Sequence, residues 1–179
     1  QSILSLFRLL VWVTDSHITL FAIIGLLAFS GCTTNDDNVD SDTIAEVFEL
    51  KNVNFDFNAT DGYNIYRSLN PKIFPSDVIL IYRMIGTIDA STPVWQQIPR
   101  TVFTSQGELD YDFDFSKEDF TIYAGGNYNL ALTPQFLNNQ TFRIVIVPGY
   151  FSKTLDANNY VSVMKALNIK ESQVQQIRL

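Results

Sequence analysis

The strongest constraint on the fold is a succession of short segments, rich in β-branched and aromatic residues, that begins near Val47. They are residues 47–57, 63–66, 78–85, 94–103, 109–115, 120–123, 128–132 and 142–147. Turn formers such as Asp61-Gly62, Asn70-Pro71 and Gly86 separate them. Short strands without intervening helices predict an antiparallel sandwich or barrel and not a parallel sheet. We expect a mainly β fold, an antiparallel β-sandwich of immunoglobulin-like or related type.

The hydrophobic pattern also predicts which strand faces are buried. In 109–115 the apolar residues alternate with aspartates, and in 53–57 they alternate with other polar residues. Such alternation is typical of a strand with one packed face and one face in water. Residues 78–82 and 144–147 are apolar throughout, so we expect them to form central strands that are covered on both faces.

After Lys153 the spacing of apolar residues changes from two to the helical period. This pattern predicts one C-terminal amphipathic α-helix near 157–168, laid on the sheet, with Asp156 or Asn158 as its N-cap. The apolar face of the helix is formed by Tyr160, Val163, Met164 and Leu167. The tail at 170–179 fits either a further helical turn or a last strand.

An apolar run at 18–29 is followed by Ser30, Gly31 and Cys32, the only cysteine of the chain. The run is shorter than the roughly 20 residues that a membrane span requires, so we expect a signal-peptide core. The pattern Leu27-Ala28-Phe29-Ser30-Gly31-Cys32 resembles the lipobox of bacterial lipoprotein precursors. The resemblance implies that residues 1–31 are removed and that Cys32 carries the lipid. The alternative is a buried helix followed by an ordinary core cysteine.

Residues 32–45 are acidic, contain no Lys or Arg, and are predicted to form a flexible tether ahead of a single domain at 46–179. The lipobox resemblance implies a bacterial envelope protein that is lipid-anchored, and we expect it at the outer membrane. In some bacteria an acidic run just after the lipidated cysteine is a surface-export tag, and Asn35-Asp36-Asp37 resembles one. The surface and the periplasmic side both stay open.

The use of histidine and cysteine limits the catalytic mechanisms open to the chain. The only histidine is His17, and both His17 and Cys32 precede the predicted domain. Removal of residues 1–31 and lipidation of Cys32 would leave no histidine and no free thiol, which excludes Ser-His-Asp, Cys-His and His-containing zinc sites. The net charge of −7 disfavours nucleic acid as a partner. We expect no cofactor.

Three aspartates, Asp110, Asp112 and Asp114, form a candidate calcium site because their spacing matches the first ligands of an EF-hand loop. Phe115 stands where that loop needs glycine, and Thr121 stands where it needs glutamate. On a strand, residues i and i+2 lie about 6.6–6.8 Å apart, too far for three carboxylates to converge on one ion. A solvent-facing row is the favoured interpretation.

Two further groups of residues are candidate sites. Asp56 paired with Asp112 or Asp114 is the candidate for glycoside hydrolysis, which requires two carboxylates about 5–10 Å apart. The other candidate is an aromatic and cationic edge for sugars or peptides. It consists of Tyr63, Tyr66 and Arg67. Strand alternation places Tyr63 and Arg67 on one face and Tyr66 on the other.

Beyond the anchor, several segments resemble a family of small β-rich bacterial lipoproteins. They are residues 76–83, 94–99, 111–115, 142–148 and 160–167. Some members carry collagen-like repeats, which this chain lacks, and the family has no assigned activity. We expect a non-catalytic binding or structural module that contacts the membrane through the lipid on Cys32 and has a glycan or an envelope protein as partner. The alternative is a carboxylate-dependent glycan-active enzyme.

Overall fold

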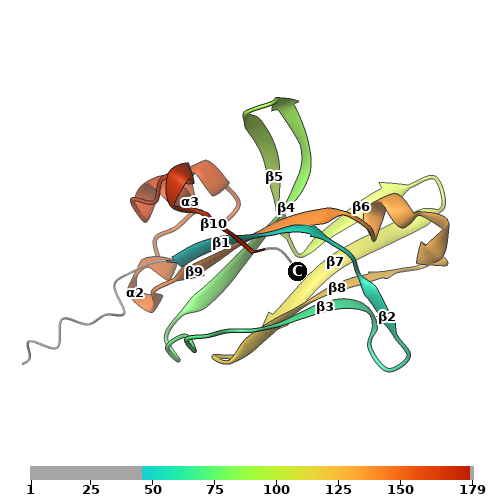
Figure 1. The fold of residues 1–179 in the computed structure, drawn as a ribbon, viewed down its shortest axis with the longest axis horizontal. Helices are drawn as coiled ribbons and strands as arrows, with labels where there is room; N and C mark the ends of the chain where they lie inside the picture. Colours follow the sequence, from blue (N-terminus) through green and yellow to red (C-terminus); the bar gives the residue numbers. More distant parts are fainter. Residues whose placement is uncertain (1–45, 178–179) are drawn as a thin grey trace, which may run out of the picture. The chain divides into compact units, whose positions relative to one another are not determined.

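The computed structural model describes residues 46–177, so the predicted signal peptide, Cys32 and the tether lie outside the described residues. The described part is mainly β and forms two open five-stranded sheets in a sandwich-like arrangement, which confirms the predicted fold class (Figure 1). Sheet A has the order β10-β1-β9-β4-β5, and sheet B has the order β2-β3-β8-β7-β6. All strand pairs are antiparallel except that of β1 with β10.

The strands of sheet A are β1 (Glu46–Val53), β4 (Val78–Asp89), β5 (Thr92–Ile98), β9 (Gln140–Val147) and β10 (Gln175–Ile177). Those of sheet B are β2 (Asp56–Asn58), β3 (Gly62–Ser68), β6 (Arg100–Thr104), β7 (Gly107–Phe115) and β8 (Asp119–Gly126). Along successive strands the chain crosses between the sheets four times, from β1 to β2, from β3 to β4, from β5 to β6 and from β8 to β9. The two central strands that the sequence predicts correspond to β9 and β4, each with a neighbour on both sides.

Apolar side chains from both sheets form the main core. Its fully buried members include Leu50, Ile81, Leu109, Ile122 and Ile144. In β7 the predicted alternation is present, because Leu109 and Tyr111 are buried while Asp110, Asp112 and Asp114 are exposed. Burial of this much apolar surface is the principal stabilising contribution in such a fold.

Four expectations about the strands are wrong. The segment 47–57 is two strands in different sheets, and since the chain changes sheet after Val53, Phe57 is 68% exposed despite its period-two spacing. The segment 94–103 likewise divides, at Pro99, because β5 and β6 belong to different sheets. Gly86 does not end its strand, since β4 continues to Asp89. The segment 128–132 contains a 3-10 helix, η2 (Leu130–Leu132), in place of a strand.

A second core covers the outer face of sheet A. Val145 and Val147 of β9 and Tyr82 of β4 pack there against the predicted amphipathic helix. That helix, α3 (Tyr160–Ala166), is shorter than predicted, and its N-cap is Asn159, whose side chain accepts a hydrogen bond from the Ser162 amide (3.1 Å). Asp156 instead accepts the amide of Asn158 in the preceding turn. A covered outer face explains why β9 is buried along its whole length.

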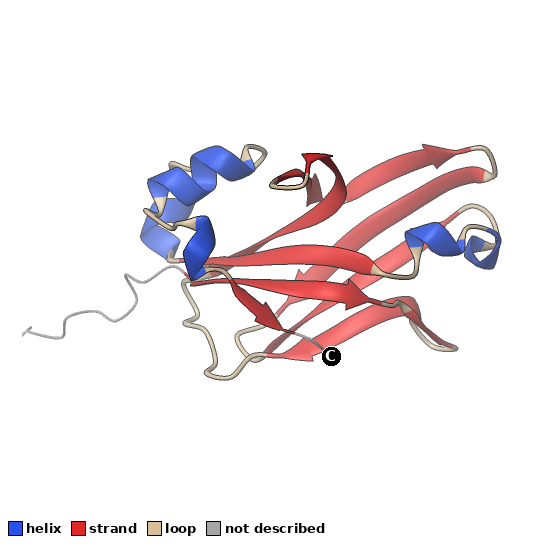
Figure 2. Cartoon of the chain, turned by 45° about the horizontal axis from the view of Figure 1, so that its top comes forward, coloured by secondary structure: helices blue, strands red, loops and turns tan. Residues whose placement is uncertain are grey.

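The C-terminal region contains more elements than the sequence predicts. A short helix, α2 (Gly149–Ser152), precedes α3, so the expectation of one helix is wrong. The ambiguous tail forms both of the predicted structures, a 3-10 turn η4 (Glu171–Gln173) and then β10. Figure 2 shows α2 and α3 at one end of the sheets, and η2 with η3 (Pro134–Phe136) at the other. None of the helices within 46–177 has the length and apolar character of a membrane span.

The distal halves of β4 and β5 form a two-stranded arm. β9 pairs with β4 only as far as Arg83, and beyond this point β4 pairs with β5 alone. Figure 1 shows the arm projecting away from the two sheets. Register shifts in this pairing coincide with the exposed side chains of Ile85 and Ile88, as is usual where a bulge redirects a side chain.

Candidate binding site

A groove lies between β1 and β10 of sheet A and β3 of sheet B. It encloses about 210 Å³. Its lining residues are Glu46, Phe48, Leu50, Arg67, Ser68, Leu69, Asn70, Pro71, Phe120, Ile146, Gln175 and Ile177. A second hollow of about 410 Å³ shares Glu46, Phe48 and Gln175 with the first and continues it toward η4. The groove therefore follows the edge of sheet A where β10 covers only three residues of β1.

The floor of the groove is apolar. The ring of Phe48 lies 6.2 Å from that of Phe120, which is opposite Arg67 in the pairing of β3 with β8. Leu50 is completely buried beside them, while Ile177 of β10 is 39% exposed at the rim. Small-molecule and peptide sites commonly combine such an apolar surface with a few directed polar groups.

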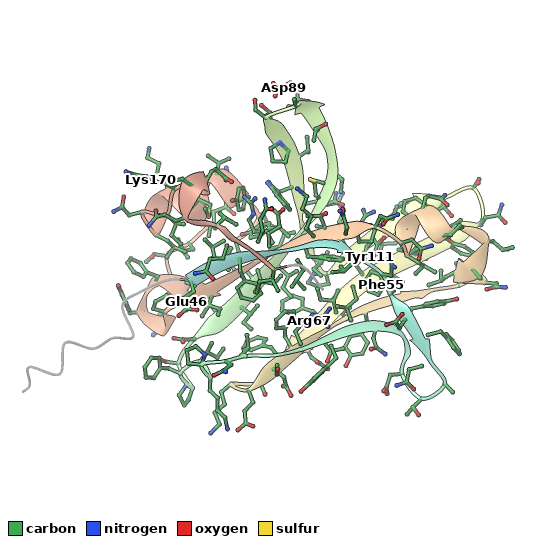
Figure 3. The ribbon with its side chains drawn as sticks, in the orientation of Figure 1. Glu46, Phe55, Arg67, Asp89, Tyr111 and Lys170 are labelled. Carbon is green, nitrogen blue, oxygen red and sulfur yellow. The ribbon has the colours of Figure 1, made fainter. Side chains whose placement is uncertain are left out.

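Arg67 supplies the directed polar group. It lies on the inner face of β3, and Figure 3 shows it between the ribbons of β1 and β3. Its Nη1 donates a hydrogen bond to the Tyr66 carbonyl, whereas its buried Nε has no acceptor in the described part of the chain. Burial lowers the pKa of the guanidinium, and the nearby charge of Asp56 opposes this effect. Among residues 46–177, no carboxylate lies within ion-pair distance of Arg67.

Of the three residues predicted as one ligand edge, one lines the groove. Tyr63 shares the inner face with Arg67 and packs its ring against Phe57 at a centroid distance of 5.2 Å. Tyr66 points to the outer face, is 54% exposed, and donates a hydrogen bond from its hydroxyl to Asp119 (3.2 Å). Only Arg67 lines the groove.

The aspartates of β7 stay separate, each with its own hydrogen-bond partner. Asp110 accepts the Thr101 hydroxyl at 2.5 Å, and Asp114 accepts the Tyr123 hydroxyl at 3.0 Å. Asp112 accepts the amide of the residue that follows it. Within the part of the chain that the structure describes, no group of three or more His, Cys, Asp or Glu side chains is arranged to hold a metal ion.

The nominated glycoside-hydrolase pair is spread across sheet B. Asp56 pairs with Asn64, Asn64 with Tyr123, and Tyr123 with Asp112. The two carboxylates are therefore three strand spacings apart, roughly 14 Å. Asp114 lies farther along β7. This separation exceeds the spacing that either glycosidase geometry uses.

A second arginine, Arg143, lies at the centre of an ionic cluster on the outer face of sheet A. Its guanidinium contacts Glu49 of β1 and Glu171 of η4, each at 2.6 Å, and the Tyr160 hydroxyl of α3. The guanidinium also lies 4.2 Å from the ring centre of Trp95. Burial lowers the pKa of Arg143, but hydrogen bonds to Glu49 and Tyr160 outweigh burial and hold the pKa above its usual value. The cluster joins the C-terminal elements to sheet A.

Arg83 is a third arginine with a buried side chain, and it is held by neutral groups of the chain. Its Nε donates to the Gln140 side chain (2.8 Å), and its guanidinium lies 4.5 Å from the ring centre of Tyr111. Sequence reasoning missed both Arg83 and Arg143. The available signal was a lone basic residue inside each of two apolar strands, where a charge is stable only with partners.

No family model matches the chain, and neither a curated protein nor a solved structure shows significant similarity to it.

Proposed function

We propose that the chain is a lipid-anchored lipoprotein of the bacterial envelope and that its sandwich domain is a non-catalytic binding module with the groove at Arg67 as its ligand site. One observation carries the binding part of this proposal. A guanidinium without an ion-pair partner among residues 46–177 lines a groove with an apolar floor. Such a group is positioned to receive an anionic ligand without a large rearrangement.

The anchor is proposed from the lipobox resemblance at Cys32. A cysteine that bears two or three acyl chains satisfies the requirement for stable membrane retention. Replacement of Cys32 with Ala should move the protein from the membrane to the soluble fraction and remove the lipid mass from its N-terminal peptide. Ser41→Ala, outside the lipobox, is the control. Membrane fractionation unchanged by Cys32→Ala would contradict the anchor.

The side of the membrane is settled by protease treatment of intact and lysed cells, with a periplasmic protein as control. Digestion in intact cells would place the domain outside and would favour a glycan or peptide from the surroundings as ligand. Protection until lysis would place it in the periplasm and would favour a partner from envelope assembly.

The ligand site is tested by screening the full chain, purified in detergent, on a glycan array and a peptide array. Arg67→Gln removes the charge in the groove. Arg100→Gln removes an equal charge from an exposed position of β6, outside the groove, and is the matched control. Binding that Arg67→Gln abolishes and Arg100→Gln preserves would support the proposal. Absence of any binding that depends on Arg67 would contradict it.

A further inference from the structure

One edge of β3 carries backbone groups without partners in the described chain. The Leu69 amide donates to the Glu118 carbonyl on the side of β8 (2.7 Å), so alternation along the strand directs the odd-numbered residues of β3 toward β8. The backbone groups of the even-numbered residues, Tyr66 and Ser68, then point away from β8. The hydrogen bond from Arg67 to the Tyr66 carbonyl agrees with this direction.

The neighbouring strand β2 does not cover these groups. β2 pairs with β3 only from Gly62 to Asn64, and the chain preceding Asp56 comes from sheet A. Among residues 46–177, nothing bonds to the amides of Tyr66 and Ser68 or to the Ser68 carbonyl. An unpaired strand edge of this kind is a template for the addition of an extended chain.

The free edge and the groove are parts of one site. Arg67 and Ser68 both line the groove, and Arg67 lies between Tyr66 and Ser68, whose amides have no partner among residues 46–177. A strand added beside β3 would place one side chain opposite Arg67, on the inner face, and the adjacent side chains on the outer face beside Tyr66. The next inward side chain would meet the apolar floor formed by Phe48 and Leu50.

We propose that the ligand is an extended peptide that pairs with the free edge of β3 at Tyr66 and Ser68, with a carboxylate against Arg67 and an apolar side chain in the groove. This inference rests on the proposed binding function and names its ligand class. Free backbone donors and acceptors on a strand edge favour a peptide over a glycan, because a peptide presents matching groups at the same spacing. Glu46 lines the part of the groove that continues into the second hollow. Because its carboxylate would repel an acidic side chain, we expect the peptide's carboxylate to bind only at the Arg67 end of the groove.

The test uses two synthetic pentapeptide mixtures with blocked ends. Both have Val, Ile, Leu, Thr and Tyr at random in four positions, and the central residue is Asp in one mixture and Asn in the other. Hydrogen exchange of the full chain in detergent is measured with each mixture. The amides of Tyr66 and Ser68 should exchange quickly alone and slowly with the Asp mixture, while the Leu69 amide, already bonded to Glu118, is the internal control.

Two pairs of variants separate the charge from the backbone pairing. Arg67→Gln should remove the preference for the Asp mixture over the Asn mixture, which we expect to be roughly tenfold or more, and Arg100→Gln should keep it. Ser68→Pro removes one free amide at an edge position that tolerates proline and should abolish binding, whereas Ser68→Ala should not. If Ser68→Pro fails to fold, the hydrogen exchange of the Tyr66 and Ser68 amides in the wild-type chain still tests whether the peptide pairs with β3.

Three results would overturn the inference. The first is no added protection at Tyr66 and Ser68 with either mixture. The second is protection that is equal with the two mixtures. The third is protection confined to β10. If these peptides fail while the glycan array shows binding that Arg67→Gln abolishes, the inference falls and the proposed function stands. If no ligand of either class depends on Arg67, both fall.

Discussion

The side chains of Arg143 and Arg67 are both at least half-buried, but the two differ in the number of carboxylates that lie close to the guanidinium. Two carboxylates lie 2.6 Å from Arg143, and one of them, Glu49, is itself buried. Arg67 is half-buried and has no carboxylate within ion-pair distance among residues 46–177. Within the described residues the Nε atoms of both lack an acceptor, so the contrast lies in the ion pairs and not in that one donor.

The difference follows from what covers each arginine. The outer face of sheet A is closed by α3 and η4, which bring Tyr160 and Glu171 onto Arg143. Across the groove from the open edge of β3, the described part of the chain provides β1 and the three-residue strand β10, and neither brings a carboxylate within ion-pair distance of Arg67. A charge that is compensated within the chain stabilises the fold, whereas a charge that is left uncompensated costs stability and is available to a ligand.

The largest effect is expected from Arg143→Met. The substitution leaves the Glu49 carboxylate buried without its partner, so we expect the free energy of unfolding to fall by about 3–5 kcal/mol. The double variant Arg143→Met with Glu49→Leu should recover most of the loss, since an apolar pair of similar volume avoids the desolvation cost. Urea denaturation followed by circular dichroism measures both. A loss below about 1 kcal/mol in the single variant would mean that the cluster does not support the fold.

The two carboxylates of the cluster should differ. Glu49→Gln keeps the shape of the side chain but removes the buried charge, and we expect a loss of about 2–3 kcal/mol. Glu171 has a side chain that is 62% exposed, so Glu171→Gln should cost no more than about 1 kcal/mol. The same denaturation measurement compares them. Equal losses would show that exposure does not govern the strength of these ion pairs.

Local sequence patterns predict the structural features that depend on residues close together in the chain. The inward direction of Leu109 and Tyr111 and the apolar face of α3 follow directly from spacings of two and of about 3.6. Phe57 was mispredicted because the chain changes sheet between Val53 and Asp56, which resets the alternation. No local pattern records such a crossing.

The sites depend on pairings between distant residues, and for that reason the sequence predicted them only in part. Glu49 and Arg143 are separated by 94 positions in the chain, and nothing in either segment specifies the other. The sequence groups Arg67 with Tyr63 and Tyr66 and predicts correctly that Tyr66 lies on the opposite face, but it does not indicate what lies across from Arg67. The groove that Arg67 lines is formed in part by Phe48 and Ile177, which come from opposite ends of the domain in the sequence.

A smaller effect is expected at Tyr111, in the core between the two sheets. Its hydroxyl donates to the Phe136 carbonyl (2.6 Å), so Tyr111→Phe should cost about 1–2 kcal/mol by leaving that acceptor unpaired. Burial raises the pKa of Tyr111 to about 12, from 10.0, although the charge of Arg83 opposes the rise.

This pKa shift also predicts a pH dependence. Above pH 10 the unfolded chain loses the phenol proton of Tyr111 while the folded chain keeps it, so stability falls as the pH rises from 10 toward 12. The Phe variant should lose less stability over this interval than the wild type. Urea denaturation on both sides of pH 10 measures the difference, and identical slopes would show that Tyr111 does not contribute to alkaline unfolding.

The smallest effect, and the one that tests the contrast between the two arginines most directly, is expected from Arg67→Met. The substitution loses one hydrogen bond to the Tyr66 carbonyl but also removes from a partly apolar setting a charge that burial disfavours and that the more distant Asp56 stabilises in part. These contributions oppose each other, so we expect a change within about 0.5 kcal/mol, against the several lost at Arg143. Side-by-side denaturation of the two methionine variants makes the measurement. If Arg67→Met were instead to cost more than about 2 kcal/mol, Arg67 would be a structural residue like Arg143, and the groove would lose the group that qualifies it as a ligand site.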